Sequence, residues 1–204
     1  MLGNHDNPRV ASRVGAQQAR VAAVLLLTLR GTPTLYYGDE IGMTDGRIPP
    51  DQIRDPAELR QPGRGQGRDP ERTPMQWDSS LANAGFTNGQ PWLPVGTMTS
   101  VREQDSDASS MLSLCRRLLA LRRGYAALVQ GAIENVVAHG DVLTYERCHG
   151  DQRLLIALNL GGADATVYAH GGVVLLSTFA GRDGRALEDG ANRLGAGEAI
   201  VAAV

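Results

Sequence analysis

Hydrophobic residues recur at helical spacing in two parts of the chain. In residues 12–30 they are dense and face almost every direction, as in a helix that packs on a sheet, with Ser12 as the predicted cap and Gly31 as the predicted end. In residues 106–128 they form one stripe, which predicts a helix with a solvent-facing side. That side carries four arginines, Arg116, Arg117, Arg122 and Arg123. Such a cluster is usually a solvated helix face, so we expect no polyanionic partner.

Short runs of β-branched and aromatic residues predict strands elsewhere. One such run, residues 32–38, lies directly after the first helix and predicts a buried strand. After Gly131 the period changes to two, and residues 139–141 form a predicted tight turn. The predicted strands of this part are residues 133–138, 142–148, 153–160, 165–169, 173–177 and 199–204. The chain is thus predicted to be α/β followed by all-β, ending in an antiparallel β-sandwich over residues 131–204.

The segment between these regions, about residues 44–105, is rich in Pro, Gly and Arg and has no strong periodicity. A connection of this length in a compact domain is normally a functional lid or a linker. It also contains Trp77, Phe86 and Trp92, and aromatic residues are uncommon in disordered segments. We therefore predict a packed loop rather than a disordered one.

Composition and charge exclude several classes of protein. The 204 residues include 20 basic side chains, all of them arginine, and 22 acidic ones, so the net charge is −2; this balance predicts no nucleic-acid partner. The longest apolar run is too short to cross a bilayer and no secretory leader is recognisable, so no membrane association is expected. Cys115 and Cys148 cannot build a disulfide framework, which favours a cytoplasmic protein. His149 and His170 stand alone near glycines, so no metal site is predicted.

Polar residues cluster near the start of the sequence, in the run Asn4-His5-Asp6-Asn7-Pro8-Arg9. Three polar side chains in a row at the end of a buried strand are costly unless they pair or take part in function. Asn, Asp and Pro also form turns, and the local pattern by itself favours a turn. A functional site at the carboxyl end of a strand is the alternative.

Three segments, in this order, resemble glycoside hydrolase family 13, the α-amylase family. The first is residues 2–9, Leu-Gly-Asn-His-Asp-Asn-Pro-Arg, which is similar to the end of the seventh barrel strand of that family. The second, residues 31–43, is similar to the eighth strand and its loop. The third, residues 67–78 with 84–87, resembles the α-glucosidase and oligo-1,6-glucosidase branch. The resemblance covers the whole chain, which corresponds to only the last part of a family member.

The resemblance implies a fold and a chemistry. Residues 1–130 would be the C-terminal portion of a (β/α)8 barrel, from the end of strand 7 through helix 8, and residues 131–204 the β-sandwich. The family hydrolyses α-glucosidic bonds with retention, which requires a carboxylate nucleophile and a carboxyl acid/base. In the family these come from the fourth and fifth strands, for which this sequence has no counterpart. We therefore expect the chain to need the N-terminal part of its own barrel as a partner, to be inactive alone and to use no cofactor.

The resemblance also assigns roles to individual residues. Asp6 would be the catalytic carboxylate that stabilises the transition state, and His5 would hydrogen-bond the same sugar. Arg72 would help to clamp the non-reducing glucose, because a guanidinium is always charged and offers a fork of donors. Asn4 and Arg9 are further substrate-binding candidates, Asn4 as a support of the loop and Arg9 at the rim of the site. Arg68, in the same run as Arg72, is an additional candidate.

The function predicted on this basis is that of a fragment of a retaining α-glucosidase, which acts on terminal α-glucosidic bonds of maltose- or isomaltose-type oligosaccharides. A fragment of a transglycosylase of the same family, such as a sucrose isomerase, is an alternative. A non-catalytic relative, the heavy chain of amino-acid transporters, is disfavoured because such proteins have typically lost active-site residues. A free-standing carbohydrate-binding sandwich is also disfavoured, since residues 131–204 contain only three aromatic residues, Tyr145, Tyr168 and Phe179. We expect both tyrosines to matter for stability rather than for substrate choice.

Overall fold

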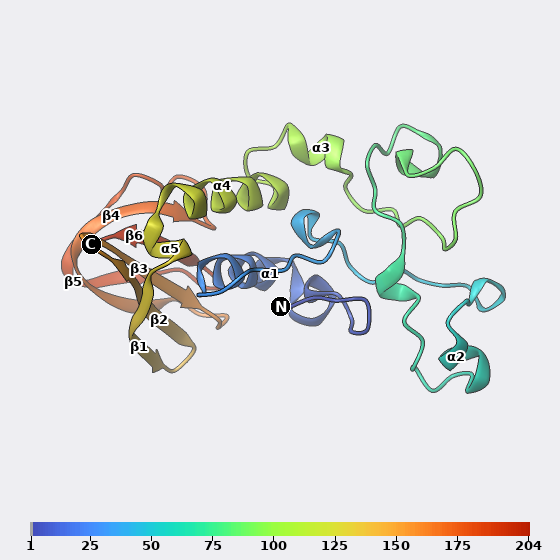
Figure 1. The fold of residues 1–204 in the computed structure, drawn as a ribbon, viewed down its shortest axis with the longest axis horizontal. Helices are drawn as coiled ribbons and strands as arrows, with labels where there is room; N and C mark the ends of the chain where they lie inside the picture. The colour runs from blue at the N-terminus through green and yellow to red at the C-terminus, as the bar shows by residue number, and fades with distance from the viewer. Residues whose placement is uncertain (1) are drawn as a thin grey trace. The chain divides into compact units, whose positions relative to one another are not determined.

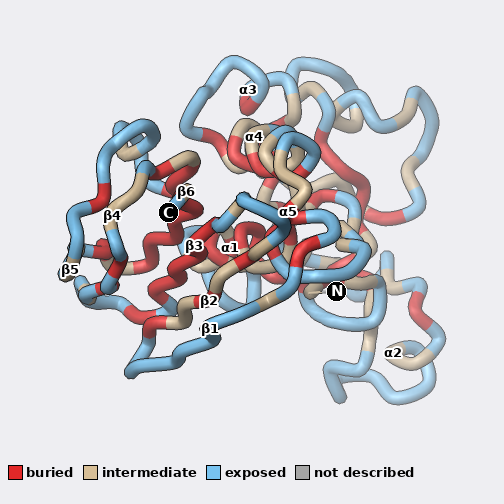
Figure 2. The backbone as a smooth tube through the Cα atoms, turned by 60° about the vertical axis from the view of Figure 1, so that its left-hand side comes forward, coloured by how far each residue is buried: buried red, intermediate tan, exposed pale blue. Residues whose placement is uncertain are grey.

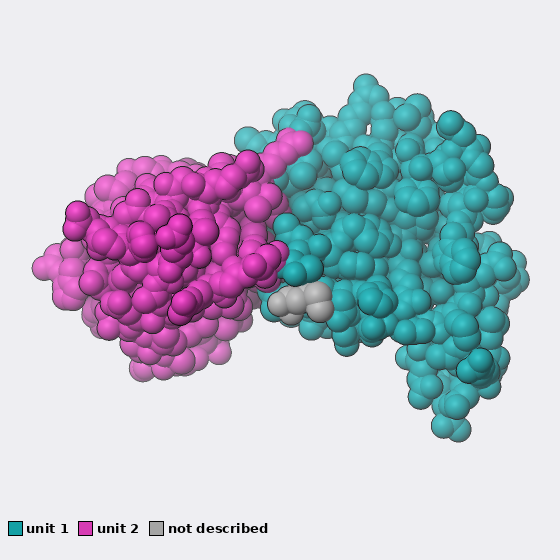
Figure 3. Space-filling view, viewed as in Figure 1, with its two compact units in different colours: residues 1–16, 34–113 teal, residues 17–33, 114–204 magenta. Residues whose placement is uncertain are grey.

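The computed structural model describes residues 2–204 and divides them into two compact units (Figure 3). Unit 1 consists of the residues up to Ala16 and of Thr34–Ser113, and unit 2 consists of Gln17–Pro33 and Leu114–Val204. The helices are α1 (Val10–Thr28), α2 (Pro56–Arg60), α3 (Val101–Asp105), α4 (Met111–Gly124) and α5 (Ala126–Val129). The strands are β1 (Ala132–His139), β2 (Val142–His149), β3 (Gln152–Asn159), β4 (Ala165–Ser177), β5 (Ala186–Leu194) and β6 (Ala199–Ala203) (Figure 1).

Both helices predicted from periodicity are present, with different ends. α1 begins before Ser12, whose hydroxyl accepts a hydrogen bond from the backbone N–H of Asp45 (2.7 Å) and caps no helix. Gly15 interrupts α1 with a φ of 78°, a conformation that glycine adopts without steric cost. The second predicted helix is divided into α4 and α5, because Tyr125 between them has an extended backbone.

The strand predicted for residues 32–38 is absent from the structure. Residues 32–36 have no regular structure, and no strand among the described residues pairs with them. A strand requires a hydrogen-bonded neighbour, which a local sequence pattern cannot supply. Side chains anchor the segment instead, since the hydroxyls of Tyr36 and Tyr37 donate to the carbonyls of Glu71 (3.1 Å) and Thr73 (2.9 Å). The eighth barrel strand that the resemblance implies is therefore not seen within the described residues, and the predicted barrel portion is not confirmed.

The long connecting segment is built from turns and short helices, and the three aromatic residues on which its prediction rested are exposed. It contains α2, α3 and several single turns of 3-10 helix. Trp77, Phe86 and Trp92 are all exposed. Hydrogen bonds that backbone N–H groups donate to carboxylates order this segment, and the aromatic content of the sequence does not reveal such bonds.

The six strands form one antiparallel sheet in the order β1-β2-β3-β6-β4-β5. Alternation predicts β1, β2, β3 and β6 closely. The two strands predicted for residues 165–177 are one strand, β4, in which Gly171 and Gly172 both have positive φ. The sequence pattern does not predict β5, because only Leu187 and Leu194 of that strand are buried.

The sheet folds around its own core in unit 2. Its central strands β3 and β6 are buried along most of their length, whereas β1 at the edge is exposed (Figure 2). The core residues are Val142, Leu155, Ala157, Val167, Ala169, Val174, Leu187, Leu194, Ile200 and Ala202. β4 pairs with β5 through residues 165–173 and with β6 through residues 173–177, so one sheet supplies both layers around this core. The predicted sandwich is thus a single folded sheet rather than two separate sheets.

Two buried arginines hold the C-terminal end of α1 within unit 2. Arg122 of α4 donates to the carbonyls of Leu27 (2.7 Å) and Gly31 (2.6 Å). Arg147 of β2 donates to the carbonyl of Thr28. A helix end exposes carbonyls with partial negative charge, so cations placed there stabilise the helix. The prediction that Arg122 faces solvent is therefore wrong, because its position is decided by the helix end that it contacts.

The two tyrosines of the sheet occupy opposite environments, which corrects the expectation that both matter for stability. Tyr145 is 2% exposed and its hydroxyl hydrogen-bonds with Thr28, whereas Tyr168 is 75% exposed. We expect Tyr145→Ala to lower the free energy of unfolding by about 3–5 kcal/mol, because it leaves a cavity in the core. Tyr168→Ala should change it by less than about 0.5 kcal/mol. Urea unfolding of both variants measures the difference, and equal losses would contradict the assignment.

Candidate functional site

The polar run near the start of the chain forms a turn that leads into α1. The Oδ1 atom of Asn4 accepts hydrogen bonds from the backbone N–H of Asp6 and from Nδ2 of Asn7, both at 2.9 Å. Asn4 therefore supports the loop, as predicted. The turn presents Asp6 at the surface with 47% of its side chain exposed. The prediction of a turn is confirmed. A turn is also compatible with a functional site, because the side chain of Asp6 is accessible.

Two arginines of the long connecting segment converge on Asp6. Nη1 of Arg68 donates to Oδ1 of Asp6 at 2.8 Å, and Nη2 of Arg72 donates to the same oxygen at 3.1 Å. Arg72 also donates from Nε to the carbonyl of His5 at 2.8 Å. The imidazole Nε2 of His5 lies 3.3 Å from Oδ2 of Asp6. The predicted proximity of Asp6 and Arg72 is confirmed, and Oδ2 is the oxygen that the arginines leave open to a ligand.

Two buried carboxylates fix the segment that carries the arginines. Asp55 caps α2, since its Oδ1 accepts from the backbone N–H of Ala57 (2.8 Å), and its Oδ2 accepts from Nε of Arg68 (2.7 Å). Oδ2 of Asp69 accepts from the backbone N–H groups of Arg54 (2.6 Å) and Asp55 (2.8 Å). These bonds tie residues 54–55 to residues 68–69. The guanidinium of Arg68 therefore bridges one buried and one exposed carboxylate.

Arg9 lies in a different place from the rim that the sequence predicts. Its side chain is fully buried, with the guanidinium carbon 5.0 Å from the ring centre of Tyr36 and 4.8 Å from that of Tyr37. Nη1 donates to the carbonyl of Tyr37 (2.7 Å), and the backbone N–H donates to Asp45 (2.8 Å). Two aromatic rings thus cover a guanidinium that local sequence reasoning leaves exposed. Arg9 joins the start of α1 to residues 36–45 and positions the preceding turn.

The electrostatics of the cluster favour an ionised Asp6. The hydrogen bond from Arg68 is the main cause that lowers the pKa of Asp6 below its ordinary value, and His5 and Arg72 act in the same direction. The same arginine lowers the pKa of Asp55 to about 2. An ionised, half-exposed carboxylate held by fixed donors can accept hydrogen bonds from hydroxyl groups. It can also stabilise positive charge that develops beside it.

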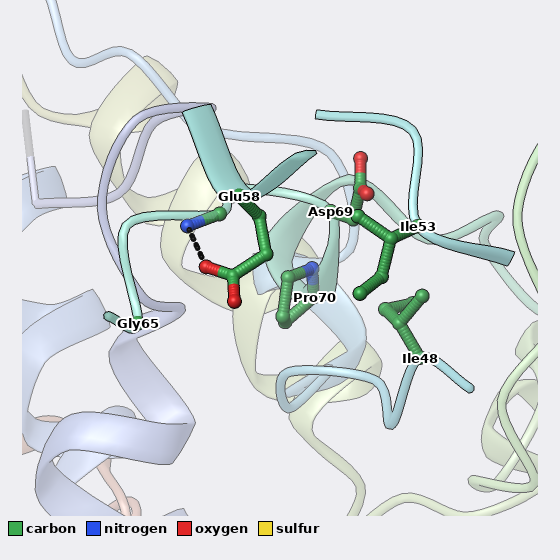
Figure 4. Close-up of a pocket in the computed structure, with 7 residues that line it drawn as sticks. Ile48, Ile53, Glu58, Gly65, Asp69 and Pro70 are labelled. Atoms are coloured by element: carbon green, nitrogen blue, oxygen red, sulfur yellow. Dashed lines mark hydrogen bonds between the residues drawn. The ribbon is translucent and has the colours of Figure 1, made fainter. Parts of the chain in front are cut away.

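A small cavity adjoins the segment of Arg68. Its volume is about 220 Å³, and its lining consists of Ile48, Ile53, Glu58, Gly65, Gly67, Asp69 and Pro70. Figure 4 shows Ile48 and Ile53 on one side and Glu58 on the other. The carboxylate of Glu58 accepts from the backbone N–H groups of Gly63 (2.6 Å) and Gly67 (3.2 Å). Glu58 therefore orders the loop that leads to Arg68.

Two other carboxyl groups near this cluster, those of Asp55 and Asp39, are poorly suited to donate a proton to a ligand at Asp6. The side chain of Asp55 has no exposed surface, and with a pKa of about 2 it remains ionised. Burial raises the pKa of Asp39 to about 6, but its Oδ1 atom is itself buried and without a hydrogen-bond partner. The cluster therefore offers one accessible carboxylate and two guanidinium groups, which is a binding arrangement rather than an acid/base pair.

Two further features concern cofactors and membranes. Among residues 2–204, no group of three or more His, Cys, Asp or Glu side chains is arranged to hold a metal ion. The described helices include none with the length and apolar character that crossing a membrane requires.

The structure adds Asp55 to the candidate site. It also supports Arg68 as a residue of the site, because Arg68 contacts both Asp55 and Asp6. Asp55 directly precedes Pro56, which is the pattern of a cap residue followed by proline at the first helical position. Arg68 stands in the same run, Gly-Arg-Asp-Pro-Glu-Arg, as Arg72. The signals for both residues are therefore present in the sequence. These local signals do not indicate that the folded segment brings Arg68 into contact with Asp6.

The contact between Asp55 and Arg68 predicts a pH-dependent stability. Folding lowers the pKa of Asp55 from 3.8 to about 2, so its ionised form stabilises the native state at neutral pH, and this contribution disappears as the pH falls from about 4 to about 2. Asp55→Asn should be about 2 kcal/mol less stable than the wild type at pH 7 and should approach it at pH 2. Urea unfolding across this range measures the difference. The exposed Asp51→Asn is the matched control, and a gap that stays constant with pH would contradict the prediction.

The family of this protein can be assigned from features already described. These are the exposed Asp6, the two arginines that contact it and the three sequence segments. Residues 1–131 match the family model described as alpha amylase, catalytic domain. The chain belongs to the α-amylase family, glycoside hydrolase family 13. The curated relatives that it matches include glycosidases.

Relatives and solved structures agree with this family. The probable alpha-glucosidase of Rhizobium meliloti is 34% identical over 174 residues, which cover 81% of this chain and 31% of that protein. The glucan 1,6-alpha-glucosidase of Streptococcus pneumoniae is 35% identical over 208 residues, covering 88% and 39%. The trehalulose synthase MutB from Pseudomonas mesoacidophila MX-45 superposes with a TM-score of 0.86 at 28% identity, covering 99% of this chain and 42% of that one. The chain thus spans well under half the length of each of these proteins.

Proposed function

We propose that this chain is the C-terminal part of a retaining α-glucosidase, which hydrolyses terminal α-glucosidic bonds of maltose- or isomaltose-type oligosaccharides. The observation that carries the proposal is Asp6, a half-exposed carboxylate that Arg68 and Arg72 hold through one oxygen. Its other oxygen, Oδ2, which neither arginine contacts and which lies 3.3 Å from Nε2 of His5, would accept a sugar hydroxyl. We place the protein in the cytoplasm, because its two cysteines cannot form a disulfide framework.

The proposal assigns residues 1–130 to the catalytic barrel and residues 131–204 to the C-terminal β-domain. The nucleophile and the acid/base of a retaining glycosidase would come from a preceding part of the barrel. The chain therefore has to assemble with that part before it can act. The open Asp6 cluster is the portion of the active site that this chain contributes.

Each residue of the cluster has a role that its contacts allow. Asp6 binds hydroxyl groups of the glucosyl unit through Oδ2 and stabilises the positive charge of the oxocarbenium-like transition state. His5, whose side chain is 65% exposed, hydrogen-bonds the same sugar. Arg72 holds Asp6 and helps to clamp the non-reducing glucose. Asn4 and Arg9 act by positioning the turn that carries Asp6.

A transglycosylase such as a sucrose isomerase is the second candidate. The observation that favours it is the similarity to trehalulose synthase over 99% of this chain. Both reactions pass through the same glucosyl-enzyme, and they differ in whether water or a sugar hydroxyl attacks it. The contacts of Asp6 are compatible with both.

A chimeric enzyme distinguishes the two candidates. Residues 1–204 replace the matching 39% of the Streptococcus glucan 1,6-alpha-glucosidase, so that the barrel is complete. We expect hydrolysis of maltose or isomaltose with release of the α-anomer of glucose, as retention requires. With sucrose, free glucose and fructose indicate hydrolysis, and a rearranged glucosyl-fructose indicates transglycosylation. A folded chimera that binds no α-glucoside would contradict both candidates.

A further inference from the structure

Tyr168 lines a pocket of unit 2 that the proposed active site does not use. The volume of the pocket is about 440 Å³, within the range of small-molecule sites, which is roughly 300–1,000 Å³. It lies where the turn between β1 and β2, the end of β3 and the start of β4 meet. The side chains with functional groups that line it belong to His139, Asp141, Asn159, Asp164, Thr166 and Tyr168.

Four polar side chains of this pocket have unused hydrogen-bonding capacity. Thr166 and Tyr168 lie two residues apart and so share one face of β4, while Val167 between them is buried in the core. His139 is the last residue of β1, and Asp141 lies in the turn between β1 and β2. In the part of the chain that the structure describes, the side chains of these four residues form no hydrogen bond with protein groups. All four are exposed, so they are available to a ligand.

The remaining wall of the pocket is held in place by hydrogen bonds. Asn159 is buried, and its Nδ2 donates to the carbonyls of Ala163 and Gly195, both at 2.8 Å. Asp164 accepts from Nε (2.8 Å) and Nη2 (2.6 Å) of Arg193. These bonds fix the connection between β3 and β4. A ligand would therefore meet a preformed wall, which lowers the entropic cost of binding.

We propose that this pocket is a second binding site for α-linked gluco-oligosaccharides, in which the ring of Tyr168 stacks on a glucose ring. An exposed aromatic ring offers a flat apolar face to the C–H groups of a sugar, and Asp141, Thr166 and His139 offer acceptors and donors to its hydroxyls. The carboxylate of Asp141 disfavours an anion. The pairing of Asp164 with Arg193 leaves too little negative charge to hold a polycation. The choice of an α-glucan ligand rests on the proposed function.

Nuclear magnetic resonance of the ¹⁵N-labelled chain, residues 1–204, tests the proposal. Maltotriose and isomaltotriose are the probes, and cellotriose is the β-linked control. We expect saturable shifts of the backbone amides of Asp141, Thr166 and Tyr168. Tyr168→Ala should weaken binding at these amides by about tenfold or more, without loss of folded signals elsewhere. Tyr168→Phe, which retains the ring, should bind within about threefold of the wild type.

His170→Ala is the matched control, because His170 is fully exposed on the same face of β4 but does not line the pocket. It should bind like the wild type. Absence of saturable shifts at the pocket, or equal affinities of Tyr168→Ala and His170→Ala, would overturn the proposal. Shifts confined to residues 4–6 would overturn it while supporting the proposed function. Shifts at the pocket that Tyr168→Ala removes would support it even if residues 4–6 did not respond.

Discussion

Asp6→Asn is expected to lower the turnover of the chimeric enzyme on an aryl α-glucoside by about a hundredfold or more. The substitution keeps the shape of the side chain but removes its negative charge. That charge would face the positive charge of the glucosyl transition state, and Arg68 and Arg72 hold it in position before the substrate arrives. Because the side chain is half-exposed, we expect the variant to remain folded.

The measurement is the value of kcat for the wild-type chimera and the variant, together with circular dichroism spectra of both. Asp51→Asn is the matched control, since Asp51 is an exposed carboxylate of the long connecting segment that makes no contact with Asp6. It should retain wild-type turnover. Near-normal turnover of Asp6→Asn in a folded chimera would refute the catalytic role of Asp6.

The chain of residues 1–204 alone is expected to hydrolyse no α-glucoside. A retaining glycosidase needs two carboxyl groups about 5 Å apart across the scissile bond. The described residues around Asp6 offer one accessible carboxylate, since Asp55 is buried and, with a pKa of about 2, ionised at neutral pH. Burial raises the pKa of Asp39 to about 6, which would suit a general acid, but its Oδ1 atom is buried.

Assays of the purified chain with maltose, isomaltose, sucrose and an aryl α-glucoside measure this. Addition of the separately expressed N-terminal part of the Streptococcus relative should create activity, because it supplies the absent carboxyl groups. Activity of the chain alone that disappears in Asp6→Ala would contradict the prediction. Asp39 would then be the next residue to substitute, as the acid partner.

Periodicity locates most elements of the fold, because burial repeats along a helix or strand. It places α1, α4 and four strands near their observed positions. It fails for β5, which has few buried apolar residues, and for residues 32–38, which have a strand-like composition but no neighbouring strand. The first failure reflects sparse burial along β5, and the second concerns strand pairing. Pairing depends on residues far away in the chain, and no local pattern contains them.

The candidate site also combines features that local motifs indicate with contacts that only the folded chain shows. The motifs around Asp6 and Arg72 indicate a sugar-binding cluster, and the structure brings the two side chains within hydrogen-bonding distance. The motifs do not indicate that Arg68 makes the shorter contact, or that Asp55 holds it from the other side. These contacts arise because α2, its cap Asp55 and the carboxylate of Asp69 fold the long connecting segment back on itself.

Residue types at short spacing are enough to indicate the family, the helical and alternating segments and the candidate site residues. Which polar and aromatic side chains are buried depends on the folded chain. Arg9 and Arg122 lie inside the protein, and Tyr168 lies outside it. The physical reason is that a guanidinium is buried where distant carbonyls and rings surround it, and an aromatic ring is exposed where the sheet turns it away from the core. Those surroundings come from residues remote in the sequence.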